Sequence, residues 1–118
     1  MSWNVELYET EGGRIPVEEF LDSLPVKHRI KVAKIINLLR EYGISLKEPY
    51  TKHIAGTKLK ELRIQASPNV YRVFYFVYID KKLVLVHGFT KKTEETPRRE
   101  IEIALNRVND YIRRANND

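Results

Sequence analysis

The 118-residue sequence contains no cysteine and no long apolar run. Without cysteine, disulfide scaffolding, thiolate zinc sites and thiol catalysis are excluded, so any catalysis must use oxygen and nitrogen groups. The longest apolar stretches, around Val70 to Ile79 and Leu83 to Val86, are far shorter than the roughly 18 to 20 residues that span a bilayer. No secretory hydrophobic region opens the chain either. We therefore expect a soluble protein located in the cytoplasm.

The length is typical of one domain with a single core. Neither an internal repeat nor a low-complexity segment divides the sequence. We therefore expect a single domain over residues 1–118.

Basic residues exceed acidic ones, and the formal net charge is +5. Residues 1–24 hold one basic residue against six acidic ones, whereas residues 25–118 hold twenty Lys and Arg against ten acidic residues. Most of the domain should therefore present a positive field that attracts polyanions such as nucleic acid. A solvated, Lys-rich surface would have the same composition. The acidic first segment either folds over the basic surface or only lowers the net charge.

The spacing of apolar residues predicts a mixed α and β fold. Alternation over residues 3–8 indicates a strand, and helical spacing predicts two helices that end before Pro25 and Gly43. Three more strands are expected at residues 59–66, 70–79 and 83–89. Thr96 and Pro97 are typical of a helix start, with a capping hydroxyl and proline at the first position. This order predicts an α+β domain in which an antiparallel sheet of about four strands is flanked by three helices, in the order β-α-α-β-β-β-α.

Arg72 is the only charged residue between Val70 and Ile79, in a stretch otherwise typical of a buried strand. Its guanidinium must pair with an acid such as Glu61, reach solvent along its own stem, or face a cleft that holds an anion. Arg63 lies on the polar face of an adjoining strand, and Lys91 and Lys92 follow the last strand. If these four cations converge, a phosphodiester is a natural ligand. Fixed cations would also stabilise the charge that develops when an RNA phosphate is transferred to a ribose 2′-hydroxyl.

No metal site is expected, because His28, His53 and His87 lack H-x-x-x-H spacing and no paired acids stand out. His87 could be a general acid or base, or a structural histidine on the same face as Phe89. His53, beside Lys52, could contact a phosphate. RNA bases stack on aromatic side chains, but most aromatic residues here must form the core. We expect one or two stacking platforms among Tyr71, Phe74, Tyr75, Phe76, Tyr78 and Phe89.

Several motifs together resemble one family. They are F-L-D-S-L-P at 20–25, L-L-R-E-Y-G at 38–43, L-K-E-L-R at 59–63, V-Y-R-V-F-Y at 70–75, and H-G-F-T-K-K-T at 87–93 with Thr96-Pro97. In this order they resemble the phage-derived, HigB-like branch of the RelE toxin superfamily, over about residues 16–110.

The resemblance implies the toxin of a type II toxin–antitoxin system. Such a toxin is an endoribonuclease, or mRNA interferase, that needs no metal or cofactor and cuts messenger RNA, usually in the ribosomal A site. It also implies a cognate helix-turn-helix antitoxin encoded beside the toxin. The catalytic residues carried over are Arg63, Arg72, Lys91 and Lys92. Further RNA contacts are expected from Lys52, Lys58, Lys60 and His87.

The sequence departs from the family where some members have a tyrosine after the last basic motif. Glu94, Glu95 and Thr96 occupy that stretch here. The proton acceptor therefore stays open among Glu61, His87, Lys92 and Tyr111, or catalysis relies mainly on electrostatics and positioning. Two other functions also stay open. One is a non-catalytic module that binds RNA or the ribosome, and the other is a ParE-like toxin that acts on a protein such as a DNA topoisomerase.

Overall fold

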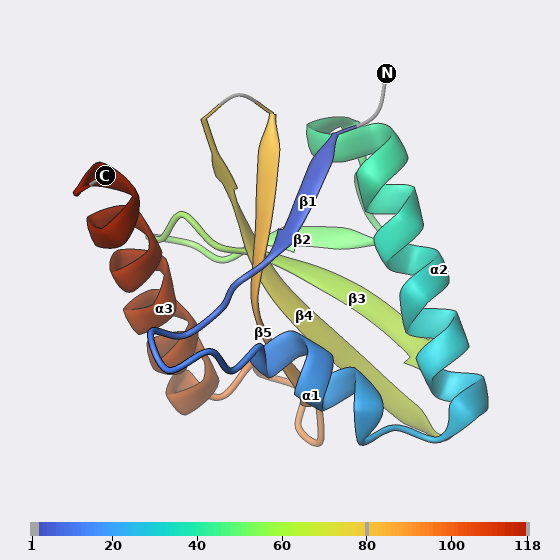
Figure 1. Cartoon of the computed structure of the whole chain (residues 1–118). Coiled ribbons are helices and arrows are strands. Elements are labelled where there is room, and N and C mark those ends of the chain that lie inside the picture. The colour runs from blue at the N-terminus through green and yellow to red at the C-terminus, as the bar shows by residue number, and fades with distance from the viewer. Residues whose placement is uncertain (1–2, 80, 118) are drawn as a thin grey trace.

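The computed structural model describes residues 3–79 and 81–117. The chain forms a five-stranded sheet with three α-helices and one short 3₁₀ helix (Figure 1). In chain order the elements are β1 (Asn4–Leu7), α1 (Pro16–Asp22), α2 (Val26–Tyr42), η1 (Gly43–Ser45), β2 (Thr51–His53), β3 (Lys60–Ala66), β4 (Asn69–Tyr78), β5 (Lys82–Thr90) and α3 (Arg98–Asn116). The predicted α+β class and all three helices are confirmed.

The strands lie side by side in the order β1-β5-β4-β3-β2. Neighbouring strands from β2 to β5 are antiparallel, whereas β1 pairs with β5 in parallel. The sheet therefore has one strand more than the four expected, because β2 lies where the sequence predicts a loop. Its three residues, Thr51–His53, are too few to show an alternating pattern.

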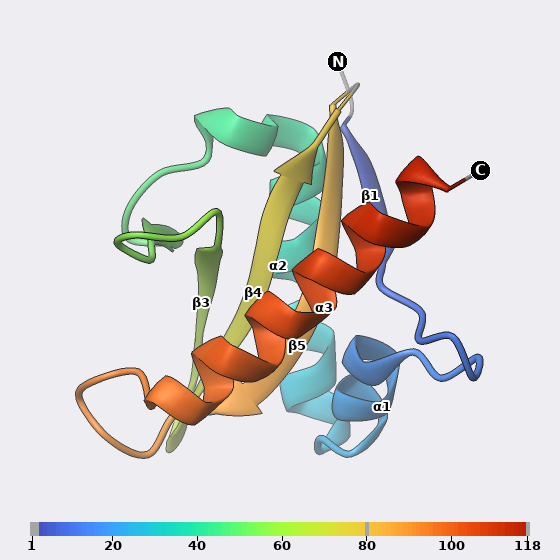
Figure 2. The ribbon, with the colours of Figure 1, turned by 90° about the vertical axis from the view of Figure 1, so that its left-hand side faces the viewer.

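Helices cover the two faces of the sheet unequally. The helices α1 and α2 pack on one face, where Val32, Ile36 and Leu39 of α2 join a core with Leu62 and Val73. The helix α3 crosses the other face over β4 and β5, so that much of β3 stays outside its cover (Figure 2). No helix among the described residues is long and apolar enough to span a bilayer.

Two glycines permit close packing at the ends of this core. Gly43 ends α2 with φ of +56°, and a β-carbon there would overlap the ring of Trp3. Gly88 on β5 lies directly against the ring of Phe20 from α1. Glycine is needed at both positions because any side chain would displace an aromatic ring.

An irregularity in β5 determines which of its side chains face α3. Phe74 pairs with His87 and Tyr75 with Leu85, so Val86 is the extra residue of a bulge. The bulge turns both Val86 and His87 toward the α3 face. His87 therefore stacks against Phe89, with ring centroids 5.6 Å apart and planes inclined by 20°.

Candidate functional site

A buried carboxylate lies on the part of the α3 face that the helix leaves open. Glu61 of β3 is only 1% exposed. One of its oxygens, Oε1, is 3.0 Å from Nε of Arg72 and 3.5 Å from Nε of Arg63. The other, Oε2, accepts a 2.8 Å hydrogen bond from the hydroxyl of Thr96. Such partners are what allow a charged carboxylate to remain in the interior.

The two arginines are brought together by strand pairing, because Arg63 of β3 lies opposite Arg72 of β4. The Arg72 side chain is 9% exposed, and one of its terminal nitrogens donates to the carbonyl of Tyr71 at 3.0 Å. Burial lowers the pKa of Arg72, and the nearby Glu61 carboxylate opposes that effect. The Nε groups of both arginines contact Glu61 without a well-directed hydrogen bond. Because both Nε atoms are buried, the terminal N–H groups of the guanidiniums are the donors left for an incoming anion.

The cationic pocket is a hollow of about 250 Å³ beside this cluster. It lies between β2, β3 and the segment that follows β5, and its lining comprises Lys52, Ile54, Glu61, Arg63, Lys91, Glu94, Glu95 and Thr96. Lys52 lies directly opposite Glu61 on the neighbouring strand. Burial lowers the pKa of Lys91, and the positive charges of Arg72, Arg63 and Lys52 lower it further while Glu61 opposes them. Four cations, together with the carboxylates of Glu61, Glu94 and Glu95, thus surround one small volume.

Four of the predicted site residues therefore meet, namely Lys52, Arg63, Arg72 and Lys91. Lys58 and Lys92 are exposed and contribute nothing to the lining of the pocket. Lys60 precedes Glu61 on β3 and pairs with His53 of β2. Because successive side chains of a strand point to opposite faces, Lys60 and His53 lie on the other face of the sheet from Glu61. Both line a separate hollow beside η1. The sheet itself therefore separates Lys60 and His53 from the cationic pocket.

His87 is held inside a different cluster. Its Nε2 lies 2.7 Å from Glu100 and its Nδ1 is 3.1 Å from Arg107, both on α3. Burial lowers the pKa of His87, the hydrogen bond to Glu100 opposes this, and the charge of Arg107 lowers the pKa further. Because Arg107 can only donate, the neutral ring carries its proton on Nε2 and donates to Glu100. Both nitrogens are engaged, and the ring does not line the cationic pocket.

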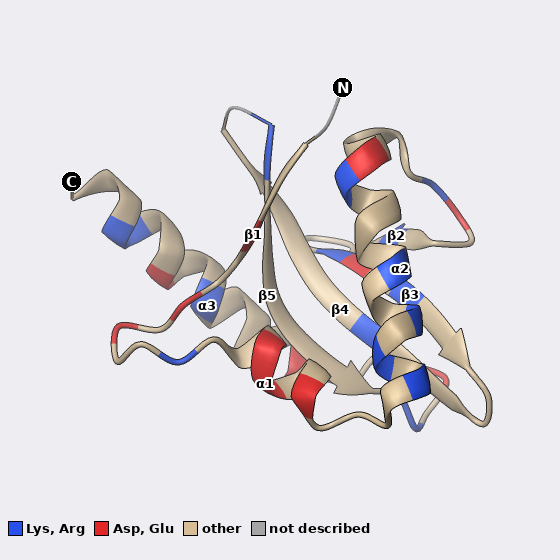
Figure 3. Ribbon diagram, turned by 45° about the vertical axis from the view of Figure 1, so that its right-hand side comes forward, with Lys and Arg blue, Asp and Glu red and all other residues tan. Residues whose placement is uncertain are grey.

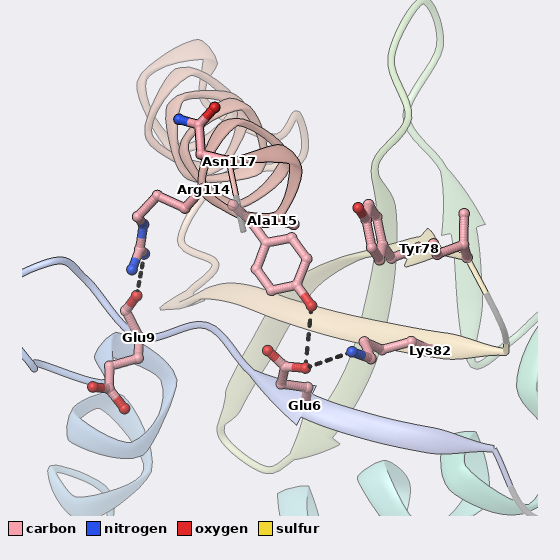
Figure 4. Close-up of a pocket in the computed structure, with 9 residues that line it drawn as sticks. Glu6, Glu9, Tyr78, Lys82, Arg114, Ala115 and Asn117 are labelled. Atoms are coloured by element: carbon pink, nitrogen blue, oxygen red, sulfur yellow. Dashed lines mark hydrogen bonds and ion pairs between the residues drawn. The ribbon is translucent and has the colours of Figure 1, made fainter.

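Tyr111 lies in another hollow, of about 670 Å³, between the end of α3 and the edge of the sheet near β1 (Figure 4). Its hydroxyl donates to Glu6 at 3.1 Å, and Lys82 is 3.4 Å from the same oxygen. Burial and then Glu6 raise the pKa of Tyr111, so the phenol stays protonated near neutral pH. Two acids, Glu6 and Glu9, balance two basic residues in the lining. This hollow is larger than the cationic pocket, but both of its basic residues are already in ion pairs, Lys82 with Glu6 and Arg114 with Asp110.

The acidic residues of the first segment lie away from the cationic pocket. Glu6 contacts Lys82, and Glu19 pairs with Arg14. Figure 3 shows acidic positions along α1, whereas Lys and Arg residues follow α2 and the neighbouring strands. The acidic first segment therefore does not fold over the basic surface, which was one of the two alternatives that the sequence left open.

Sequence reasoning missed two features of the site. Thr96 was expected to cap the last helix, but α3 begins at Arg98 without any side-chain cap. The Thr96 hydroxyl instead holds Glu61. The second feature is a neighbouring groove lined by Tyr50 and Lys31. Both residues lie outside the motifs on which the family resemblance rests.

Six aromatic residues had been expected to include a stacking platform. Five of them are buried, and Tyr78 packs against the α3 core through Phe76 and Tyr111. The described residues contain no group of three or more His, Asp or Glu side chains placed to hold a metal ion.

A comparison with protein-family models identifies a family. The model of phage-derived, Gp49-like proteins (DUF891) matches residues 19–109. No curated protein matches the sequence significantly. Among solved structures, a chain in the crystal structure of the archaeal RelE–RelB complex from Pyrococcus horikoshii OT3 is similar at 24% identity, over 75% of this chain and 93% of that chain, with a TM-score of 0.48.

Proposed function

This chain belongs to the Gp49-like family of phage-derived proteins, and we propose that it is a toxin that cleaves messenger RNA on the ribosome. The observation that carries the proposal is the convergence of Lys52, Arg63, Arg72 and Lys91 beside one pocket. A cluster of cations with free donors fits a phosphodiester. The position of the cluster, on the part of the sheet that α3 leaves open, gives a polymer access to it.

The reaction that this site favours is internal transfer of the RNA phosphate. The ribose 2′-oxygen attacks the adjacent phosphorus, the bond to the 5′-oxygen breaks, and the products carry a 2′,3′-cyclic phosphate and a 5′-hydroxyl. Negative charge builds up on the phosphorus oxygens during this step. Arg63, Arg72 and Lys91 are already held in place by the sheet and would stabilise that charge without reorganisation.

Glu61 is the proton acceptor that the geometry favours. Of the four candidates, Tyr111 and His87 belong to other clusters, and Lys92 is exposed outside the pocket. The Glu61 carboxylate lines the pocket between the two arginines. It would accept the proton of the 2′-hydroxyl, while a cation such as Lys91 supplies a proton to the leaving 5′-oxygen.

A toxin of this kind requires an inhibitor, and the family resemblance supports a helix-turn-helix antitoxin as the partner. Inhibition would require that the antitoxin block the cationic pocket or displace one of its cations. The proposal thus names three partners, which are messenger RNA, the ribosome and the antitoxin.

The test is induced expression of the wild type, Arg72→Ala and the control Arg98→Ala, followed by growth curves and primer extension on a known transcript. Arg98→Ala removes the same charge as Arg72→Ala, but Arg98 lies on α3 in an exposed ion pair with Glu102. We expect growth arrest and discrete cuts within translated frames for the wild type and Arg98→Ala. Arg72→Ala should lose at least about 100-fold in cleavage, as expected for one donor to the developing charge.

Purified Arg72→Ala should keep its fold, because Glu61 still contacts Arg63 and Thr96. A folded Arg72→Ala protein that cuts RNA like the wild type would overturn the assignment. Growth arrest without cuts would instead indicate a block of translation or a protein target.

A further inference from the structure

A second groove adjoins the cationic pocket and shares Arg63 with it. The Tyr50 groove, as we call it, measures about 380 Å³ and lies between α2, the loop before β2 and the outer edge of β3. Its lining includes Lys31, Ile35, Tyr50, Arg63, Gln65 and Arg72. Any phosphate held by the two arginines would therefore lie at the entrance of this groove.

The walls of the groove combine features that suit a nucleoside. Ile35 and Pro49 supply apolar surface, whereas Lys31 adds a third cation next to the two arginines. A groove with aromatic and apolar walls and a few polar groups is typical of a small-ligand site. The arrangement places phosphate-binding groups at one end and a surface for a flat ring at the other.

Tyr50 is fixed in place although its ring is accessible. Its N–H donates to the carbonyl of Lys47 at 3.0 Å, and its own carbonyl accepts the N–H of Arg63 at 2.7 Å. The residue is 39% exposed, and no hydrogen bond to its hydroxyl occurs among the described residues. A ring on a rigid backbone with an open face is a ready platform for base stacking.

Gln65 offers polar groups at the same edge. The N–H of Arg63 points outward to Tyr50, and in a strand the backbone groups of residue 65 point the same way as those of residue 63. Because β2 pairs with β3 only as far as Leu62, no described strand lies opposite Gln65. Its backbone and its exposed amide side chain are therefore available to the edge of a base.

We propose that the Tyr50 groove binds the nucleobase next to the phosphate in the cationic pocket, with the base stacked on Tyr50. This inference rests on the proposed function, because it assigns RNA as the ligand of the adjoining pocket. It makes Tyr50 a positioning residue that brings the ribose and its phosphate to Arg63 and Arg72. A purely structural Tyr50, which only covers Ile35 and Ile64, is the alternative.

The test measures RNA affinity apart from cleavage. The probe is a fluorescein-labelled single-stranded RNA of mixed sequence with every ribose 2′-O-methylated, so that no nucleophile is present, and its binding is followed by fluorescence anisotropy. A second probe has the same backbone without bases. The variants are Tyr50→Ala, Tyr50→Phe, Arg72→Ala, and the control Tyr42→Ala, which removes a tyrosine exposed at the end of α2.

We expect Tyr50→Ala to weaken binding of the base-containing probe by about 5- to 150-fold, the range found for loss of one stacked base. Tyr50→Phe and Tyr42→Ala should bind like the wild type, because both retain the proposed stacking ring. On the abasic probe Tyr50→Ala should equal the wild type, whereas Arg72→Ala should bind both probes less tightly. A 2-aminopurine placed at the cut site should lose fluorescence on binding to the wild type but not to Tyr50→Ala.

Equal binding of the base-containing probe by Tyr50→Ala and the wild type would overturn the inference and leave the proposed function intact. An equal loss on both probes would also overturn it, because the effect would then not depend on a base. If the wild type binds neither probe, the inference is wrong, and the primer-extension test on translated transcripts decides the proposed function by itself. A Tyr50 effect on binding, in a wild-type protein that makes no cuts in translated transcripts, would support the groove and contradict the nuclease.

Discussion

The α3 face of the sheet carries two clusters that each contain an arginine and a carboxylate. One is Glu61 with Arg63, Arg72 and Thr96, and the other is Glu100 with His87 and Arg107. In both clusters burial shifts pKa values, that of Arg72 in the first and those of His87 and Arg107 in the second. Burial and pKa shifts therefore do not by themselves distinguish a functional site from a structural one.

The Glu61 cluster, here called the open cluster, borders a pocket, whereas the Glu100 cluster, here called the covered cluster, lies under α3. They also differ in how many of their polar groups have hydrogen-bond partners. In the covered cluster, Arg107 also donates to the carbonyl of Val86 at 2.8 Å, and both nitrogens of His87 have partners. In the open cluster, the Nε groups of Arg63 and Arg72 lack directed hydrogen bonds. Lys52 and Lys91 add further positive charge there. The open cluster thus borders a pocket, whereas both ring nitrogens of the covered cluster already have partners, and matched variants can test this contrast.

The largest expected effect comes from replacing the central carboxylate of each cluster by its amide. Glu61→Gln should cut RNA about 100- to 10,000-fold more slowly, because the proton acceptor is lost. It should nevertheless bind the 2′-O-methylated RNA about fivefold more tightly or better, since a negative charge near the phosphate is removed, which is worth about 1 kcal/mol even in bulk water. Single-turnover cleavage and anisotropy measure the two effects separately.

Glu100→Gln is the matched control in the covered cluster. It should leave cleavage by folded protein near the wild-type rate and lower only the melting temperature. If Glu61→Gln lowers both cleavage and RNA affinity, Glu61 acts only by positioning the two arginines and is not the proton acceptor. Loss of cleavage in folded Glu100→Gln would erase the distinction between the two clusters.

A smaller effect should appear in the pH dependence of stability. Because the pKa of His87 is lowered in the folded state, the unfolded chain binds the proton more tightly. The stability contributed by neutral His87 is then complete above the ordinary histidine pKa of about 6.5 and is lost as the pH falls through the lowered value. The loss amounts to about 1.4 kcal/mol for each unit by which the pKa is lowered.

Urea unfolding of the wild type and His87→Gln between pH 8 and pH 5 measures this contribution. The free energy of unfolding should fall less steeply in His87→Gln, and its cleavage activity at pH 8 should match that of the wild type. His53→Gln, which removes an exposed histidine, should keep the wild-type slope. Parallel curves for His87→Gln and the wild type would contradict a neutral, buried His87.

The sequence predicts most of the fold because long elements show their periodicity. The helix α2 begins at Val26 and ends before Gly43 as expected, and the resemblance to the phage-derived branch of the RelE superfamily is confirmed by the Gp49-like match. The features that the sequence did not predict are either short or depend on residues far away in the chain. The strand β2 has three residues, and the parallel pairing of β1 with β5 joins segments almost eighty residues apart.

The candidate site was predictable in kind but not in detail. An isolated arginine in an apolar strand, Arg72, correctly indicated buried charge with a partner, and the E-L-R motif supplied that partner in Glu61. The local sequence pattern cannot show that Lys52 joins the Glu61 cluster while Lys60 lies on the opposite face of the sheet. These positions depend on the pairing of β2 with β3, and β2 was not predicted. Nor can it show that Thr96 bonds Glu61 thirty-five positions away.

The smallest expected effect concerns the acidic rim of the cationic pocket. Glu94 and Glu95 line its outer side and are exposed, so they should repel a phosphate backbone. Replacing both by glutamine should tighten binding of the 2′-O-methylated RNA a few-fold at low salt, as expected for exposed charges worth up to about 1 kcal/mol each. The gain should vanish toward 1 M salt, where the screening length is only about 3 Å.

The matched control replaces Glu9 and Glu11, two exposed acids of the first segment that lie outside the cationic pocket, and it raises the net charge by the same amount. Only the Glu94 and Glu95 pair should tighten binding, because screened charges act over short distances. Equal gains for both pairs would mean that RNA senses the total charge of the domain rather than a local pocket. The contrast between the open and the covered cluster would then lose its electrostatic basis.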